Sequence, residues 1–513
     1  MSTEIELKLL IAPEDARRLL RHPLILALTR QKLPAQRLLS IYYDTPDCAL
    51  HKQRIALRLR HVGRRWIQTV KTEGRVSAGL HERPEWECDT TKDTFVFDTI
   101  PDPAVREFFA DEQLQQALQP VFVTEVTRAR RILELASSDV VECSLDRGEI
   151  RAGDDRLPIC EIELELKSGE PVRLFEFTLS LQDTLSLKLE NVSKAERGYQ
   201  LVTHAASVPV KAKTSELDTS LSVREAFIRI FQSCTEHLQA NEEGLLRGDD
   251  DSEFVHQMRV ALRRARSALR MFSSILSSEK TEAVSKELRW LASALNRARN
   301  WDVFVLTTLP PILVVFPDHQ GLAWLHTHSA TIRQHSNAQA RDAVASPHYQ
   351  RFLLTLGAWL CTLAEPTASP NGAAKSGETD LCAFAAAILQ KRHRQLKNRG
   401  KHVTILSPAE RHAVRIAAKK LRYAAEFFSS MYPGKRTRKY IGALAALQDV
   451  LGTFNDNATT ETLLQEIITA EDMAVHQHPE GVVLGWVQGA SHARLAELAR
   501  TWDAFIEQKP FWR

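Results

Sequence analysis

Hydrophobic and charged residues alternate in short runs along the first 200 residues of the chain. The run nearest the N-terminus places Glu4, Glu6 and Lys8 between single apolar residues. Successive side chains of a β-strand point to opposite faces, so this run predicts a strand with one apolar and one charged face. An ordinary half-buried strand shows the same alternation, and one run alone therefore says little about function.

The alternation recurs and predicts a series of strands with this two-faced character. They cover Ile5–Ile11, Leu38–Tyr43, Ile55–Arg60, Trp66–Lys71, Glu85–Cys88, Val121–Leu133, Val140–Leu145 and Cys160–Leu166. Two helices, Pro13–Leu20 and Val105–Ala117, and two turns, Asp146–Gly148 and Ser168–Gly169, are predicted among them.

From about residue 203 the pattern changes to that of helices. Residues 203–221 are polar and are predicted to form a linker, and residues 222–505 carry apolar positions at the 3.6-residue period of helices. A stretch rich in proline, glycine, serine and alanine, 366–379, divides the helical region into two halves. The pattern predicts an α+β protein with a strand-rich domain over 1–202 and an all-α domain after the linker.

The two helical halves contain a repeated segment. The copies are His256–Arg266 and His412–Arg422, which place a histidine, an arginine, a basic pair and a final arginine at the same spacing, 156 residues apart. An aspartate follows each copy, Asp302 in the first half and Asp456 in the second. Such exact spacing predicts an internal repeat.

Composition limits the broad class of protein. With 513 residues, of which 44% are hydrophobic, the chain is long enough for two or three domains. The longest apolar stretch, Leu306–Phe316, is too short and too broken by prolines to span a bilayer, and the N-terminus does not have the pattern of a signal peptide. The seven cysteines form no Cys-x-x-Cys pair, and the net charge is only +3. We expect a cytoplasmic protein without a membrane partner, whose anion-binding surfaces arise from local clusters of charge.

The charged faces of the predicted strands carry both signs. Such strands either form a sheet with its charges in water or close into a barrel whose inner charges must be compensated. Carboxylates beside arginine and lysine suit a hydrated Mg²⁺ that holds a polyphosphate, because Mg²⁺ prefers oxygen ligands and basic side chains neutralise phosphate.

In order along the chain, these charged motifs resemble the CYTH superfamily, also called triphosphate tunnel metalloenzymes. The matching motifs are Glu4-x-Glu6-x-Lys8, Tyr42-Tyr43-Asp44-Thr45, Arg58-x-Arg60, Lys71, Arg83-x-Glu85-x-Glu87, Arg128-x-Arg130, Asp146 and Glu161-x-Glu163-x-Glu165. The resemblance covers about the first 200 residues. It implies an eight-stranded antiparallel β-barrel that forms a tunnel, and a divalent-metal-dependent attack on triphosphates.

The same resemblance implies roles for individual residues. The candidate ligands of Mg²⁺ or Mn²⁺ are the carboxylates of Glu4, Glu6, Asp146, Glu161, Glu163 and Glu165. Which of them bind the metal stays open. Phosphate binding falls to Lys8, Arg58, Arg60, Lys71, Arg128, Arg130, Lys188 and Lys194. The catalytic positions are Glu4, Glu6, Lys8, Glu85 and Glu87.

The repeated helical segments each predict a basic stripe along one helix. The stripes consist of His256, Arg259, Arg263 and Arg266, and of His412, Arg415, Lys419 and Arg422. A charged stripe is ordinarily a solvated helix face, but acids are absent from both stripes and the repeat is exact. The segments resemble the CHAD domain, the conserved histidine α-helical domain, over residues 222–505.

That resemblance implies a helical bundle with an internal repeat and a basic groove that binds inorganic polyphosphate. Nucleic acid is a poorer fit, because single-strand binders interleave aromatic stacking platforms with their basic residues and Tyr423 is nearly alone here. We expect protonation of His256 and His412 to strengthen anion binding at mildly acidic pH.

Together the two resemblances predict an enzyme similar to the bacterial inorganic triphosphatases. It would hydrolyse tripolyphosphate to diphosphate and phosphate with a divalent metal, and its helical domain would bind polyphosphate. The alternatives are a thiamine triphosphatase or adenylate cyclase of the same superfamily, or a non-catalytic polyphosphate-binding protein. The carboxylates favour an enzyme, since anion binding alone would not need them.

Overall fold

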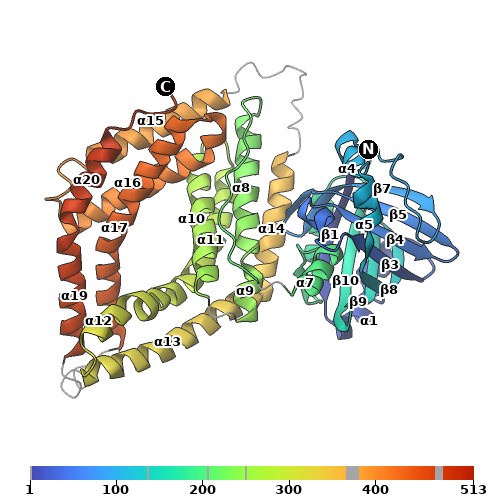
Figure 1. Ribbon diagram of the computed structural model, residues 1–513, viewed down its shortest axis with the longest axis horizontal. Helices are drawn as coiled ribbons and strands as arrows, with labels where there is room; N and C mark the ends of the chain where they lie inside the picture. Colours follow the sequence, from blue (N-terminus) through green and yellow to red (C-terminus); the bar gives the residue numbers. More distant parts are fainter. Residues whose placement is uncertain (1–2, 136–137, 205–206, 249–250, 365–379, 468–477) are drawn as a thin grey trace. The chain divides into compact units, whose positions relative to one another are not determined.

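The chain folds into two compact units. The computed structural model describes residues 3–135, 138–204, 207–248, 251–364, 380–467 and 478–513, without the side chains of Asn455 and Asp456 (Figure 1). The barrel unit comprises Met1–Val208 and Ser346–Glu365, and the helical unit comprises Pro209–Ala345 and Pro366–Arg513. The predicted break at 366–379 lies outside the described residues.

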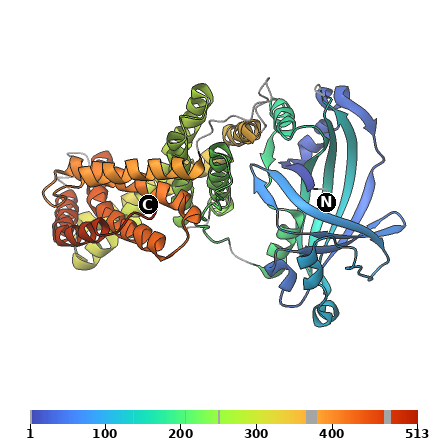
Figure 2. The ribbon, with the colours of Figure 1, turned by 90° about the horizontal axis from the view of Figure 1, so that it is seen from above.

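An antiparallel barrel of eight strands forms the centre of the barrel unit, as predicted (Figure 2). Each strand pairs with the next, and the last pairs with the first, in the order β1 (Thr3–Ile11), β10 (Asp155–Ser168), β9 (Val140–Ala152), β8 (Gln119–Glu134), β3 (Gln36–Asp44), β4 (Ala56–Val62), β5 (Arg65–Lys71) and β7 (Leu80–Thr90). The shorter strands β2 (Thr29–Lys32), β6 (Arg75–Ser77) and β11 (Leu187–Leu189) extend it. Closure turns the charged faces of these strands inward.

Helices cover the outer, apolar face of the barrel and one helix enters its interior. The helices α4 (Pro103–Phe108) and α5 (Glu112–Ala117) lie over an apolar cluster around Leu57 and Leu59, both fully buried. The helix α7 (Lys194–Thr203) places Tyr199 against Phe122 of β8, within a core cluster. The outer layer also includes α1 (Pro13–Leu19), α2 (Pro23–Leu28), α3 (Ala49–Lys52) and α6 (Val172–Leu181).

The helix α14 (Pro347–Ala364) packs with the barrel unit although the sequence around it is helical. The backbone N–H of Leu189 on β11 donates to the side-chain Oε1 of Gln350 at 2.9 Å. Gly357 lies against the ring of Phe175 on α6, so closely that a Cβ at this glycine would meet the ring at 2.3 Å. Residues far apart in sequence thus complete one layer of the barrel unit.

Two local predictions are wrong. The turn predicted at Asp146–Gly148 is part of the continuous strand β9, where a Cβ on Gly148 would lie 1.9 Å from the carbonyl oxygen of Glu125. This glycine therefore allows close approach of two strands and does not mark a turn. The single helix predicted at Val105–Ala117 is two helices, because the side chain of Asp111 caps the second one by accepting from the backbone N–H of Gln113.

The helical unit has no strand among its described residues, in agreement with the predicted all-α domain. Its helices are α8 (Val223–Gln239), α9 (Glu242–Arg247), α10 (Glu253–Met271), α11 (Ser278–Val303), the π-helix η1 (Phe304–Thr308), α12 (Leu309–Val315), α13 (Gln320–Ala345), α15 (Leu381–Arg399), α16 (Pro408–Phe427), the 3₁₀ turn η2 (Ser429–Met431), α17 (Lys435–Ile467), α19 (Pro479–Ala493) and α20 (Leu495–Ile506). The repeated segments fall on α10 and α16. Among the helices described, none combines the length and the apolar character needed to cross a membrane.

Candidate active site and a second basic cavity

Strand pairing brings charged residues of both signs together on the inner face of the barrel. Lys8 on β1 lies opposite Glu163 on β10, and Glu161 on β10 lies opposite Asp146 on β9. Asp146 in turn lies opposite Arg128 on β8. The two-residue period of each strand and the register of its neighbours therefore gather charges of both signs across four strands.

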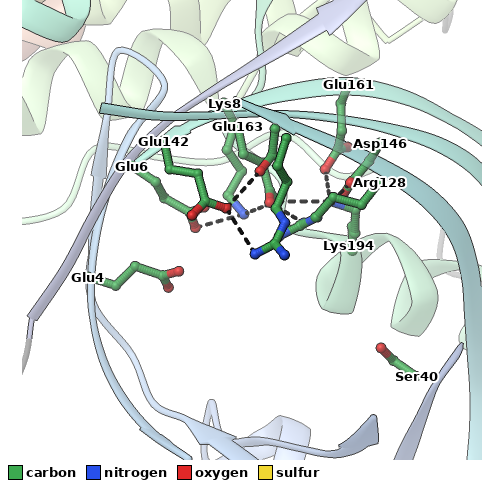
Figure 3. A network of polar contacts seen from close by, with 12 residues as sticks. Glu4, Glu6, Lys8, Ser40, Arg128, Glu142, Asp146, Glu161, Glu163 and Lys194 are labelled. Carbon is green, nitrogen blue, oxygen red and sulfur yellow. Dashed lines mark hydrogen bonds and ion pairs between the residues drawn. The ribbon is translucent and has the colours of Figure 1, made fainter. Parts of the chain in front are cut away.

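Three carboxylates form a buried cluster, which we call the carboxylate triad: Asp146, Glu161 and Glu163. One oxygen from each lies within 4.8 Å of the others (Figure 3). The ammonium of Lys194, the first residue of α7, lies 2.7 Å from Asp146 and 2.8 Å from Glu163, and it also pairs with Glu161. Oxygen donors of this kind suit a hard divalent cation, and Lys194 supplies the compensating positive charge.

The surrounding charges hold Glu163 of the triad ionised. Burial alone would raise the pKa of Glu163, but Lys194, Lys8 and Arg128 outweigh burial and keep this pKa well below its usual value. Burial opposes the charged form of Lys8 as well, and the carboxylates of Glu163 and Glu6 nevertheless raise the pKa of Lys8 above its usual value. These shifts have the directions expected for buried and mutually paired charges.

A second network occupies the facing wall. Lys71 on β5 lies 2.6 Å from Glu4 and 2.9 Å from Glu85, and Arg58 lies 3.3 Å from Glu85 and 3.4 Å from Glu87. Burial alone would raise the pKa values of Glu85 and Glu87, but the surrounding groups together lower both, chiefly Lys71 and Arg58 at Glu85, and Arg58 with a hydrogen bond from Thr69 at Glu87. Both carboxylates are therefore ionised at neutral pH.

Arg60 stands out because its positive charge is not compensated. Its Nε donates to the hydroxyl of Ser40 at 3.0 Å, and it forms no ion pair with any carboxylate that the structure describes. Burial first, and then the neighbouring charges of Arg58 and Arg128, lower the pKa of Arg60 to about 10. A half-buried arginine that is repelled by two others is stabilised when an anion binds.

These networks enclose a cavity of about 80 Å³ at the centre of the barrel. Of the described residues, seven basic side chains line it, Lys8, Arg58, Arg60, Lys71, Arg83, Arg128 and Lys194, against the three carboxylates Glu4, Glu6 and Glu163. The excess of positive charge makes the cavity suited to a polyanion.

A much larger basic cavity, of about 950 Å³, lies in the helical unit. Arg259 and Arg263 on α10 and Arg415, Lys419 and Arg422 on α16 line it. Burial, and then Arg263 and Arg299, lower the pKa of Arg259 to about 9, which reflects crowding of like charges. This cavity too is suited to an anion.

Comparison with protein families identifies both units. One family model, the CYTH domain, matches residues 2–199, and a second, the CHAD domain, matches residues 229–465. The chain contains a CYTH domain joined to a CHAD domain. Over 206 residues it is 38% identical to the inorganic triphosphatase of Haemophilus influenzae, a match that covers 39% of this chain and 55% of that protein. The match thus spans just over half the length of that relative.

A solved structure supports the CHAD assignment. The CHAD domain from the plant Ricinus communis has 34% identity and a TM-score of 0.50, with 59% of this chain and 98% of that chain covered. A putative adenylyl cyclase from Hippeastrum with a dominant triphosphatase activity covers 38% of this chain and 96% of that chain, at 16% identity and a TM-score of 0.29. The second likeness is too low to carry any argument about this chain.

The CYTH barrel gathers most of the predicted site residues, but three lie at its margin. Glu165 pairs with Lys167 at 2.6 Å, and burial raises the pKa of Glu165 above its usual value. Arg130 lies 3.7 Å from Glu142, and Lys188 is exposed on β11; neither lines the cavity in the described part of the chain.

Two basic residues of the CYTH domain were missed as site residues. Arg83 lines the cavity, and Arg197 pairs with Glu161 of the triad. Arg83 could have been found, because it shares a strand face with Glu85 two residues later. Arg197 follows Lys194 by one helical turn, but no strand or helix pattern showed that α7 enters the barrel.

In the CHAD domain, Arg266 and His412 do not line the cavity in the part that the structure describes, whereas the other six predicted residues do. His412 is exposed on α16. The expected protonation of His256 is wrong for the free protein, because burial and then Arg299 and Arg263 lower its pKa to about 3. The side chain of Asp302 is buried and accepts from Arg333 at 2.8 Å, so it positions α13 and does not line the cavity.

Lining residues that the sequence did not indicate include Lys211, Lys213 and Arg299. The two lysines lie in the segment predicted to be a linker, and Arg299 lies on α11, outside the repeated segments. The chain contributes to the CHAD cavity from more elements than its repeats suggested.

Proposed function

We propose that the CYTH barrel hydrolyses inorganic triphosphate, releasing diphosphate and phosphate, with Mg²⁺ or Mn²⁺ as cofactor. The observation that carries this proposal is the small cavity with seven basic side chains and only three carboxylates, among which Arg60 has no carboxylate partner in the described residues. A triphosphate chain offers the dense negative charge that such a lining requires.

The carboxylates fit a divalent cation by the chemistry of their oxygen donors. Glu4, Glu6 and the carboxylate triad are the residues that would hold it. A bound Mg²⁺ or Mn²⁺ would offset the charge of the phosphoryl oxygens and so favour attack at phosphorus.

The protein's own residues would act chiefly by position. Arg58, Arg60 and Arg128 would hold the phosphates, and Glu85 and Glu87 would orient a water, since their lowered pKa values keep them ionised as hydrogen-bond acceptors. The water oxygen bonds to the terminal phosphorus, the anhydride P–O bond breaks, diphosphate leaves with the bonding electron pair, and the proton of the water passes to solvent. Such reactions depend mainly on positioning and electrostatic stabilisation.

The lining of the cavity favours an inorganic chain. Ten of its fifteen described lining residues are charged and Tyr42 is the one aromatic side chain among them, so the lining offers little apolar surface to a nucleoside or a thiamine group. There are three alternatives. Thiamine triphosphate hydrolysis predicts a different preferred substrate, ATP cyclisation predicts a cyclic product, and binding without catalysis predicts no phosphate release.

The test is phosphate release from tripolyphosphate, ATP, thiamine triphosphate and long polyphosphate, each with and without Mg²⁺ or Mn²⁺. We expect tripolyphosphate to be preferred, and Glu4→Gln or Glu6→Gln to lower kcat by about 10²-fold. Glu107→Gln, an exposed carboxylate on α4, is the matched control and should keep full activity. Full activity in both cavity variants would refute the site.

We propose further that the CHAD cavity binds inorganic polyphosphate. Among the residues that the structure describes, nine lysine and arginine side chains line it and only two carboxylates do, Glu426 and Asp449. Glu426 is already paired with Arg264 at 2.7 Å and with Arg422 at 2.6 Å. Titration calorimetry with polyphosphate should give binding that Arg259→Ala weakens. Equal affinity for polyphosphate and for random RNA would contradict a preference for phosphate chains.

A further inference from the structure

The segment between the two domains enters the basic cavity of the helical unit. Residues 209–221 precede α8 and lie outside the range matched by the CHAD model, which begins at residue 229. The segment has no helix or strand, yet it is not a free spacer, because it is hydrogen-bonded to helices of the helical unit on both sides of its two lysines.

On the N-terminal side, Val210 is fixed by Asn241. The Oδ1 of Asn241 accepts from the backbone N–H of Val210 at 2.9 Å, and its Nδ2 donates to the carbonyl of Val210 at 3.0 Å. Asn241 is fully buried, so this pair of hydrogen bonds sets the position of the backbone firmly.

On the C-terminal side, Ser430 holds the segment. Its hydroxyl accepts from the backbone N–H of Leu217 at 2.9 Å and donates to the carbonyl of Ser215 at 3.0 Å. Ser215 and Leu217 are themselves buried. The residues between these two attachments, 211–214, are therefore held in place along the cavity that they line.

Lys211 and Lys213 are exposed and form no ion pair with a carboxylate in the described part of the chain. Both line the cavity together with Arg259, Arg263 and Lys419. Placing two unpaired lysines beside other cations costs free energy unless an anion compensates them. Their long stems let both ammonium groups reach an anion in the cavity.

We propose that residues 209–217 form a strap across the basic cavity and that Lys211 and Lys213 bind the polyphosphate chain held there. The strap deepens the proposed function of the helical unit and rests on it. A polyphosphate in the cavity would thus contact the repeated helices and the segment that leads from the CYTH domain. The binding site is larger than the CHAD family match.

The test compares polyphosphate binding by the full chain and by the double variant Lys211→Ala/Lys213→Ala. We expect about tenfold weaker binding at 0.1 M salt. Because each lost cation–phosphate contact releases one counterion fewer, the slope of log K against log salt should fall by about two. The matched control is Lys280→Ala/Lys286→Ala, which removes two exposed lysines of α11 that do not line the cavity.

Limited trypsin digestion gives a second readout. Cleavage after Lys211 and Lys213 in the wild-type protein should be slowed by added polyphosphate, whereas cleavage after Lys280 should not. If the wild type binds polyphosphate but the double variant binds with the same affinity and salt slope, the strap is refuted and the cavity stands. If the wild type does not bind, the proposed function of the helical unit is itself refuted, and the strap with it.

Discussion

Replacing Lys194 by methionine should destabilise the barrel unit strongly. The ammonium of Lys194 lies among the carboxylates of Asp146, Glu161 and Glu163, all buried. Burial disfavours the charged lysine, and the three carboxylates nevertheless raise its pKa above the usual value. Methionine keeps the apolar stem and removes the charge. Leaving a buried charge without its partner costs about 3–5 kcal/mol, so we expect the free energy of unfolding to fall by that amount.

Urea denaturation in chelator, followed by tryptophan fluorescence, measures this loss. Lys92→Met, which removes an exposed lysine, should unfold at the wild-type midpoint. A divalent cation that takes the place of the ammonium should restore stability to the Lys194 variant, by about 2.7 kcal/mol at a concentration 100 times its Kd. The reasoning is refuted if Lys194→Met unfolds like the wild type in chelator. If Mg²⁺ and Mn²⁺ stabilise the variant no more than the wild type, the triad is not a site that a divalent cation can fill.

Three further predictions concern pH, packing and the CHAD histidine. The depressed pKa of Glu163 contributes stability that is complete above the unfolded pKa of about 4.3 and is lost as the pH falls through the folded pKa. The urea midpoint should therefore decline less steeply from pH 6 to pH 3 in Glu163→Gln than in the wild type. Gly357→Ala should lower the free energy of unfolding by about 1–3 kcal/mol, because the added methyl group would overpack against Phe175. Gly485→Ala places its Cβ where no atom lies within 4 Å, so it should be neutral or stabilise by up to about 1 kcal/mol. Equal thermal midpoints for the two variants would contradict this. Because the pKa of His256 is lowered to about 3, its neutral isostere His256→Gln should show the same change in polyphosphate affinity between pH 8 and pH 6 as the wild type, and a smaller change would mean that this histidine titrates.

Periodicity in the sequence predicted much of the fold. The alternation in segments such as Ile5–Ile11 marked the strands of the barrel, and the 156-residue repeat marked α10 and α16. The sequence-based prediction failed where one residue type has two common structural roles. Gly148 predicts a turn because glycine often marks one, but here glycine permits close approach of β8 and β9.

The same limit applies to the second basic cavity. A helical wheel places Arg266 in the stripe with Arg263, but only the packing of other helices decides which part of a stripe borders a cavity. Lys211 and Lys213 carry no periodic signal at all. They reach the cavity because Asn241 and Ser430 hold the flanking backbone.

The sequence by itself determined which residues share a face, because side-chain direction follows from the local backbone period. The strand period alone requires that Glu4, Glu6 and Lys8 lie on one side of β1. Only the tertiary structure decided what that face would meet. Closure of the barrel placed Glu163 2.8 Å from Lys194, a residue on a helix 31 positions later. Burial and the pairing of the side chains then decided which charges are compensated and which, such as that of Arg60, are not.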